Sequence, residues 1–368
     1  MPTFFILLFI LYIGGNGYIQ LRGWQALTQA SWGIKWLWTL LQWGAVSLFF
    51  VSFFGRHLEL SAIWMRTAQL IGTGWLVFTL YMVMLLMIFD LMKIMHIVIP
   101  HRFFVALTLT ISLLAYGYYR YSHPVTKVIN MVINKPAATQ TTDTMRIVAI
   151  SDVHLGYGTH KKQLQGYAEA INRLQPDLIV IAGDLIDNSI TPVRAAHMEE
   201  ELRQLKAPMG IYMVPGNHEY ISGYESCADF LKLTPIHLLR DSVVSLPNGL
   251  QLIGRDDRHN RRRQPLSELM QQTDPLRPIL LLDHQPYQLE ETVQHQIDLQ
   301  FSGHTHRGQI WPLSLITDQL FTLSHGYRQI QQSHLYVSSG LSLWGPPFRI
   351  GTDSEMVLFQ ITFKPTSK

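Results

Sequence analysis

Four long apolar runs occupy the first third of the chain, and they restrict its folding more than any other feature of the sequence. They cover about Phe4–Leu21, Trp36–Phe54, Leu70–Phe89 and Phe103–Tyr119. A helix needs about 20 apolar residues to cross the hydrocarbon core of a bilayer, and a helix of a soluble all-helical domain would have a polar stripe that these runs lack. We therefore expect residues 1–122 to form a transmembrane region with about four helices.

The first run differs from the others because Gly14, Gly15, Asn16 and Gly17 interrupt it, so whether it spans the membrane stays open. A cleaved signal peptide would account for one apolar run but not for four. We expect an integral protein of the cell (inner) membrane. If all four runs span, the Lys/Arg count favours a cytoplasmic location of the soluble part by five residues to four. If the first run does not span, the orientation inverts.

The charge is divided unevenly between the apolar region and the rest of the chain. Residues 1–135 contain nine of the 29 Lys/Arg and two of the 26 Asp/Glu, a formal charge of +7, and the remainder carries −4. No nucleic acid is expected as a partner, because the soluble part is not basic. The single cysteine, Cys227, excludes an intramolecular disulfide and a cysteine metal cluster.

Residues 123–144 are expected to be a linker, because they contain Pro124, Pro136 and a polar stretch. In residues 145–368, short apolar runs of strand length alternate with helical stretches, which indicates sheet layers covered by helices. Two helices are expected, over Lys161–Arg173 and Arg194–Lys206. Nine strands are expected, at Arg146–Ser151, Leu178–Ala182, Gly210–Val214, Val243–Leu246, Leu250–Gly254, Ile279–Leu282, Leu299–Ser302, Leu335–Ser338 and Met356–Phe363.

Polar residues follow five of these strands at the point where each strand ends. Open α/β architectures collect their sites at the carboxyl ends of strands. We therefore expect these short segments to form one site. They are Asp152-Val153-His154, Gly183-Asp184, Gly216-Asn217-His218-Glu219, Asp283-His284 and Gly303-His304-Thr305-His306.

The donors in these segments are carboxylate, amide oxygen and imidazole, with no thiolate. That set suits Mn, Fe, Zn or Mg rather than a structural zinc cluster. One metal with open positions needs only three or four protein ligands, and seven are enough for two metals that share a bridging carboxylate. The seven candidate ligands are Asp152, His154, Asp184, Asn217, His284, His304 and His306.

The five segments, in this order, resemble the pattern of the calcineurin-like metallophosphoesterases. The resemblance covers roughly Met145–Phe363 and says nothing about the apolar region. It implies an α/β fold, a two-sheet β-sandwich flanked by helices, and a centre of two divalent or mixed-valence metal ions. It also implies that Asp152, His154 and His306 hold one metal, that Asn217, His284 and His304 hold the other, and that Asp184 bridges them.

The resemblance further implies that His218 is a catalytic residue that binds no metal. It would protonate the leaving oxygen or stabilise developing charge, a role that suits an imidazole at neutral pH. Asp187 and Asp283 are expected to cap helices or to support ligands, and Glu219 to shape the site.

The expected function is therefore hydrolysis of phosphodiester, phosphomonoester or diphosphate bonds by a metal-activated hydroxide. A non-catalytic metal-binding scaffold or sensor module at the membrane is the alternative. A transporter or channel with an attached regulatory domain is disfavoured, because the apolar runs hold few charges.

The segment Arg255–Arg263 contains five arginines in nine residues. It suits either a grip on a phosphate-rich substrate or anionic lipid surface, or a solvated loop with no specific role. Within the family, some bacterial members cleave lipid-linked UDP-sugar diphosphates and others act on generic phosphodiesters. Both a soluble and a lipid-linked phosphate ester stay open as the substrate, with membrane lipids as further partners.

Overall fold

A computed structural model describes residues 2–54, 61–136 and 144–364. The chain forms two compact units. The first comprises Met1–Tyr119 and Gly345–Phe348, and the second comprises Arg120–Trp344 and Arg349–Lys368.

The first unit is helical. Its elements are α1 (Pro2–Ala26), α2 (Trp32–Phe54), α3 (Ala62–Thr67), the π-helical segment η2 (Ala68–Thr73), α4 (Gly74–Ile94) and α5 (Arg102–Ser122), whose last three residues belong to the second unit.

Three stretches of helix among the described residues are long and apolar enough to cross a membrane: Trp32–Phe54, Ile63–Ile94 and Arg102–Ser122. They contain the second, third and fourth apolar runs, and the first run lies in α1. Of the four or so spans expected, three have a candidate helix in the part of the chain that the structure describes.

The polar interruption of the first run lies inside α1 and does not break it. Asn16 is fully buried and accepts a hydrogen bond from Trp75 Nε1 at 2.9 Å through its Oδ1. Its Nδ2 donates to Thr79 Oγ1 at 3.2 Å, and its carbonyl accepts from Gln42 Nε2 at 2.6 Å. Such polar contacts hold helices together where lipid gives no hydrophobic drive, so Asn16 joins α1 to α2 and α4.

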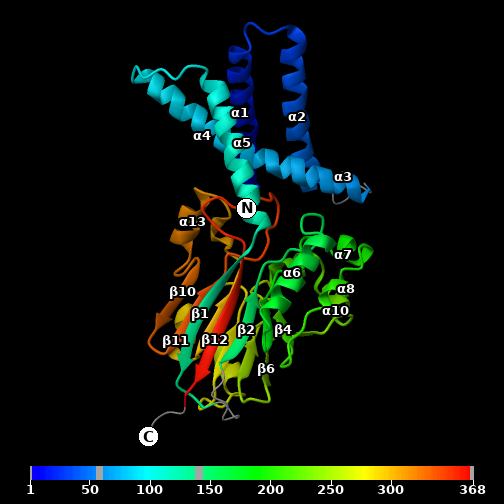
Figure 1. Ribbon diagram of the computed structural model, residues 1–368, viewed down its shortest axis with the longest axis vertical. Helices are drawn as coiled ribbons and strands as arrows, with labels where there is room; N and C mark the ends of the chain where they lie inside the picture. The colour runs from blue at the N-terminus through cyan, green and yellow to red at the C-terminus, as the bar shows by residue number, and fades with distance from the viewer. Residues whose placement is uncertain (1, 55–60, 137–143, 365–368) are drawn as a thin grey trace. The chain divides into compact units, whose positions relative to one another are not determined.

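The second unit contains two six-stranded sheets with orders β1-β12-β2-β3-β4-β5 and β10-β11-β9-β8-β7-β6 (Figure 1). The strands are β1 (Val125–Ile133), β2 (Met145–Ile150), β3 (Leu178–Ala182), β4 (Ile211–Val214), β5 (Ile236–Leu238), β6 (Ser242–Ser245), β7 (Gln251–Gly254), β8 (Ile279–Leu282), β9 (Leu299–Ser302), β10 (Gly326–Ile330), β11 (Ser333–Val337) and β12 (Glu355–Phe363). The helices are α6 (Lys161–Arg173), α7 (Thr191–Ala195), α8 (Glu199–Leu202), α9 (Asn217–Ile221), α10 (Tyr224–Leu231), α11 (Leu266–Met270), α12 (Leu289–Gln294), η3 (His306–Gly308) and α13 (Leu313–Leu320).

The sheets pack face to face, and helices cover their outer faces. In β3, Leu178, Val180 and Ala182 join the core between the sheets, whereas Ile179 and Ile181 join the core under α6. Because both faces are buried, the strand is a continuous apolar run rather than an alternating one. The other sheet buries its outer face against α11. The predicted fold class, a two-sheet β-sandwich flanked by helices, is confirmed.

Parallel pairing places the ends of the site-bearing strands together. β2, β3 and β4 are mutually parallel neighbours, and so are β7, β8 and β9 in the other sheet. The carboxyl ends of parallel strands lie at one edge of a sheet. The segments after β2, β3, β4, β8 and β9 therefore start from two facing sheet edges.

All nine predicted strands are present, with ends shifted by at most two residues. β1 corrects the expectation that residues 123–144 are a linker, because Val125–Ile133 pairs in parallel with β12 along its whole length. Its exposed and partly buried residues alternate, as in an edge strand with one solvated face. The helix expected over Arg194–Lys206 is also wrong: α7 and α8 are separated at His197, whose φ is +51°.

Candidate metal centre

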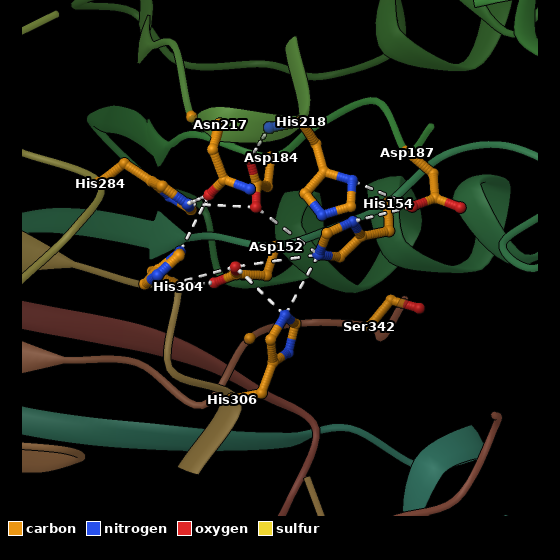
Figure 2. A network of polar contacts seen from close by, with 12 residues as sticks. Asp152, His154, Asp184, Asp187, Asn217, His218, His284, His304, His306 and Ser342 are labelled. Atoms are coloured by element: carbon orange, nitrogen blue, oxygen red, sulfur yellow. Dashed lines mark hydrogen bonds and ion pairs between the residues drawn. The ribbon is translucent and has the colours of Figure 1, made fainter. Parts of the chain in front are cut away.

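The seven candidate ligands meet at the carboxyl ends of five strands (Figure 2). Asp152 and His154 follow β2, Asp184 follows β3, and Asn217 opens α9 after β4. From the second sheet, His284 follows β8, and His304 and His306 follow β9. The structure thus brings together every ligand candidate that the sequence suggested.

The first group of ligands contains Asp152, His154 and His306, which are all buried. The Nε2 atoms of His154 and His306 lie 3.2 Å apart. Asp152 Oδ1 is 3.4 Å from Nε2 of His306 and 3.9 Å from Nε2 of His154. Three donor atoms from two loops, those after β2 and β9, therefore surround one small volume.

The second group contains Asp184, Asn217, His284 and His304. His284 Nε2 lies 3.1 Å from Asp184 Oδ2 and 3.2 Å from Asn217 Oδ1. His304 Nδ1 lies 2.9 Å from the same Asn217 oxygen. Asp184 Oδ2 is also 3.9 Å from His154 Nε2 in the first group, so Asp184 lies between the two groups.

The donor set fits metal ions. His284 Nδ1 is 2.7 Å from the Ala182 carbonyl, which fixes a proton on Nδ1 and turns Nε2 toward Asp184 and Asn217. Without a cation, the carboxylate, amide and imidazole acceptor atoms of the candidate ligands would face one another in a buried space with too few donors. A bound cation would satisfy these acceptors.

The protonation states of Asp184, His304 and His306 also suit metal binding. His284 is the exception: burial lowers its pKa, but the charge and hydrogen bond of Asp184 outweigh burial and raise it well above its usual value, so a cation would displace a proton from this ring. Burial opposes the charge of Asp184, but the charge and hydrogen bond of His284 outweigh it and hold the pKa of that carboxyl well below its usual value. Burial and the charge of His284 lower the pKa of His304 to about 3, and burial with the charge of His154 lowers that of His306. Neutral imidazoles and an ionised carboxylate are the forms that bind metals. Asp152 differs, because burial raises its pKa, a cost that a neighbouring cation would offset.

Five of the seven candidate ligands have a left-handed backbone. Asp and His tolerate this region better than most non-glycine residues, but each such residue is strained and needs support from its surroundings. Such strain clusters at functional sites. The residues and their φ angles are Asp152 (+54°), His154 (+49°), Asp184 (+53°), His304 (+72°) and His306 (+48°).

Two glycines of the sequence motifs permit close approach of the ligand loops. A Cβ at Gly216 would lie 2.2 Å from Asp184 Oδ1, and one at Gly303 would lie 2.3 Å from Asp152 Oδ2. Side chains at these positions would displace the carboxylates. Glycine is therefore required before Asn217 and before His304, because a side chain there would overlap the carboxylates of Asp184 and Asp152.

His218 lies beside the first group without joining it. Asp187 Oδ1 is 3.2 Å from His218 Nδ1 and 3.4 Å from His154 Nδ1, so one carboxylate oxygen orients both rings (Figure 2). Burial lowers the pKa of His218, but the hydrogen bond to Asp187 and the charge of Asp184 raise it above its usual value overall. His218 is therefore suited to hold a proton at this edge of the centre.

Glu219 fixes the ligand loops through their backbone amides. Its Oε2 accepts hydrogen bonds from the amides of Asp184 at 2.9 Å and Gly216 at 2.7 Å, and its Oε1 accepts one from Ile186 at 3.0 Å. Burial and the Asp184 charge raise its pKa to about 7.

The arginine-rich segment is partly structural. Arg255 and Arg263 are largely buried and donate to Asp283, next to His284, at 3.2 and 3.1 Å. Asp283 is thus a support for a ligand loop. Arg258 is exposed and lies over the Tyr287 ring at 4.7 Å. Arg255 and Arg263 are therefore not available to grip a substrate.

Arg349 is a site-supporting residue that sequence reasoning missed. It is fully buried, and its guanidinium donates to the carbonyl of His306 at 3.1 Å and to those of Ser339 at 2.5 Å and Ser342 at 2.8 Å. The amide of Ser342 in turn donates to the Asp152 carbonyl at 3.0 Å. No motif surrounds Arg349, so nothing in the sequence set it apart from a surface arginine.

Comparisons with known proteins agree with this geometry. Residues 145–308 match the family described as calcineurin-like phosphoesterase, and all seven candidate ligands lie in that range. An uncharacterized metallophosphoesterase of Helicobacter pylori is 35% identical over 223 residues, 59% of this chain and 60% of that protein. A transmembrane protein with metallophosphoesterase domain from Danio rerio is 32% identical over 68% of this chain and 60% of its own length.

A third relative is covered almost completely. The uncharacterized metallophosphoesterase YkuE of Bacillus subtilis is 31% identical over 263 residues, 68% of this chain and 91% of that protein. By contrast, the chain spans about 60% of the length of the Helicobacter and Danio relatives. The chain belongs to the calcineurin-like metallophosphoesterase family.

Proposed function

We propose that this protein hydrolyses phosphate esters with two divalent metal ions held by its seven candidate ligands. The observation that supports this most is that oxygen and imidazole donors from five separate loops surround two adjacent volumes. Asp152, His154 and His306 would hold one ion. Asn217, His284 and His304 would hold the other, with Asp184 between them.

Two metal ions bound side by side supply a hydroxide nucleophile at neutral pH and offset the negative charge on the phosphate. The remaining chemistry falls to the chain's own residues. His218 would donate its proton to the leaving oxygen of the ester, which general acid catalysis accelerates by about 10²–10⁴. Asp187 would hold the His218 ring by its Nδ1, so that Nε2 faces the substrate.

The candidate membrane helices support one choice of substrate class. We propose a phosphate ester that is lipid-linked, with a phosphodiester, phosphomonoester or diphosphate bond as the one cleaved. A substrate confined to the bilayer would reach a membrane-anchored enzyme by lateral diffusion. The protein would lie in the cell (inner) membrane with the second unit on the cytoplasmic side, as the small excess of Lys/Arg favours.

The test uses purified full-length protein loaded with Mn²⁺ and a generic aryl phosphodiester. Asp184→Asn and His306→Ala should each abolish hydrolysis and lower the bound metal, because each removes a buried ligand. The matched control is His197→Ala, which changes an exposed histidine outside the site. Unchanged turnover in both ligand variants would refute the proposal.

A non-catalytic metal-binding scaffold remains the second candidate. The presence of His218 beside the ligands, oriented by Asp187, argues against it. Two bound metals with no turnover of monoesters, diesters, nucleotides or lipid diphosphates would favour the scaffold.

A further inference from the structure

The short helix α13 leaves large apolar side chains on the surface of the second unit. Leu313, Leu315, Ile316 and Leu320 are 41%, 54%, 55% and 68% exposed, and together they form what we call the α13 apolar face. Ser314, on the opposite side of the helix, is buried. Large exposed apolar side chains gathered on one short helix indicate an interaction surface.

The α13 apolar face lies next to a point where the chain passes between its two units. The second unit contains Arg349–Lys368, and the preceding residues Gly345–Phe348 belong to the membrane unit. Ile310 forms a bridge with Ile350, and the Trp311 amide donates to the Ile350 carbonyl at 2.8 Å. The helix therefore starts beside residues that are joined covalently to the membrane unit.

The end of a candidate membrane span is attached to the same region of the second unit. Arg120, near the end of α5, forms an ion pair with Asp353. The next residue, Tyr121, lies with its hydroxyl 3.4 Å from Ser342 Oγ. Because the candidate span Arg102–Ser122 ends here, the bilayer surface is expected around the Ser342–Asp353 loop.

Two tryptophans at this location fit a membrane interface. Trp311, two residues before α13, is 47% exposed, and Trp344, in the same loop as Ser342, is 50% exposed. Tryptophan is enriched where lipid headgroups meet the hydrocarbon core.

We propose that the α13 apolar face, with Trp311 and Trp344, inserts into the interfacial layer of the lipid bilayer. The partner is the lipid surface itself, because the face adjoins the end of a span and combines an apolar outer side with flanking tryptophans. This contact is separate from the spanning helices, and it does not depend on the proposed hydrolysis.

Insertion of α13 would also fix the position of the candidate metal centre relative to the lipid surface. α13 follows η3, which contains His306, and a Cβ at Gly308 would lie 2.5 Å from the Leu313 backbone. The ligand loop and the helix therefore pack directly on each other. Insertion of α13 would hold the loop with His304 and His306 at the lipid surface, where a phosphate group of a membrane amphiphile lies.

The experiment places a fluorescent probe on the full-length protein in phosphatidylcholine nanodiscs. Ile316→Cys and, independently, Leu320→Cys are labelled with a small environment-sensitive dye. The native Cys227 is buried, and burial raises its pKa to about 11, so it should not react. Gln272→Cys is the matched control, because Gln272 is exposed and lies two residues before Asp274, whose amide donates to Gln251 at the start of β7, the end opposite the ligand-bearing strand ends.

Nanodiscs with a spin label on the lipid acyl chain should quench both α13 probes at least twofold, and aqueous iodide should not. The control probe should show the reverse. Iodide quenching of both α13 probes to the level of the control would overturn the proposal, because the face would then lie in water. Protection from both quenchers would also overturn it, because a protein surface, from this chain or a second copy, would then cover the face.

Discussion

The carboxylate of Asp187 lies between two histidine rings, and it links a candidate metal ligand to the candidate proton donor. Its Oδ1 is within 3.4 Å of Nδ1 of both His154 and His218. Burial raises the pKa of Asp187, but the hydrogen bonds from both histidines outweigh burial and lower it. The carboxylate is therefore ionised and keeps both rings in the orientation that presents their Nε2 atoms.

Asp187→Asn should weaken metal affinity or turnover by about 10–100-fold, the usual effect of losing a ligand's hydrogen-bond partner. The measurement is turnover as a function of Mn²⁺ concentration. Asp229→Asn is the control, because that carboxylate is 63% exposed and pairs with Lys232 at the surface. An Asp187→Asn enzyme with wild-type metal dependence and rate would contradict the orienting role.

His218→Ala should keep both metals and lose about 10²–10⁴ in rate, the span expected for a missing general acid. Its ring is outside the two proposed ligand groups, and only its backbone amide contacts Asp184, at 2.8 Å. Metal content and rate are measured on the same preparation. Loss of metal from this variant would make His218 a ligand instead.

At the scale of elements, sequence patterns predicted the strands that end at the site and missed three of the four edge strands, β1, β5 and β10. β3 and β8 are unbroken apolar runs because both faces are buried, so they stand out in the sequence. β5 has three residues, and β10 is exposed along most of its length. Neither has an apolar pattern that a single sequence could reveal.

The loops around the ligands were predicted in part, for a physical reason. A motif such as Gly-Asp or Gly-Asn-His marks residues that need close approach to one another, as Gly216 and Asp184 show. Arg349 acts through backbone carbonyls of distant loops, and such contacts leave no local pattern. The hydrogen bonds of Asn16 inside the helical unit could not be predicted either, because a polar residue in an apolar run indicates only that the run is interrupted.

β1 changes where a soluble fragment can begin. It pairs with β12 over nine residues, so a fragment from about Asp143 would expose an apolar strand edge of β12. We expect a fragment starting at Arg120 to be soluble and active, and one starting at Asp143 to aggregate or lose stability. Gel filtration and thermal unfolding compare the two. Equal stability would show that β1 is dispensable.

The ion pair at the start of the second unit gives a pH-dependent stability. Burial raises the pKa of Asp353, but the hydrogen bond and charge of Arg120, with Lys127, outweigh it and lower the pKa below its usual value. Because the pKa of Asp353 is lower in the folded chain, its charge stabilises the fold at pH values above the pKa of the unfolded chain, which is about 4. This contribution is lost as the pH falls through the pKa of the folded chain.

Asp353→Asn should therefore lower the Tm of the Arg120 fragment at pH 7, with a difference that shrinks below about pH 4. Thermal unfolding at pH 7, 5 and 3 measures this, with Asp229→Asn as the surface control. A difference of the same size at every pH would mean that the Asp353 charge is not its cause.

At the scale of the whole molecule, one chain joins a helical membrane unit to a metallophosphoesterase sandwich. The family match covers residues 145–308 and thus only the second unit. The division of the chain can be predicted from the sequence, because the apolar runs of the first unit have the length of a membrane span and those of the second unit have the length of a strand. The pairing of ligands into two groups came from the family resemblance, because spacing along a chain does not specify which loops meet in space.

The proposed hydrolysis depends on two metal ions lying side by side among these loops. Crystals of the Mn²⁺-loaded protein, measured at the manganese absorption edge, would locate the metals by anomalous scattering. We predict two peaks about 3.5–4 Å apart, one against Asp152, His154 and His306 and one against Asn217, His284 and His304, with Asp184 in contact with both. A single peak, or peaks away from these side chains, would contradict the account.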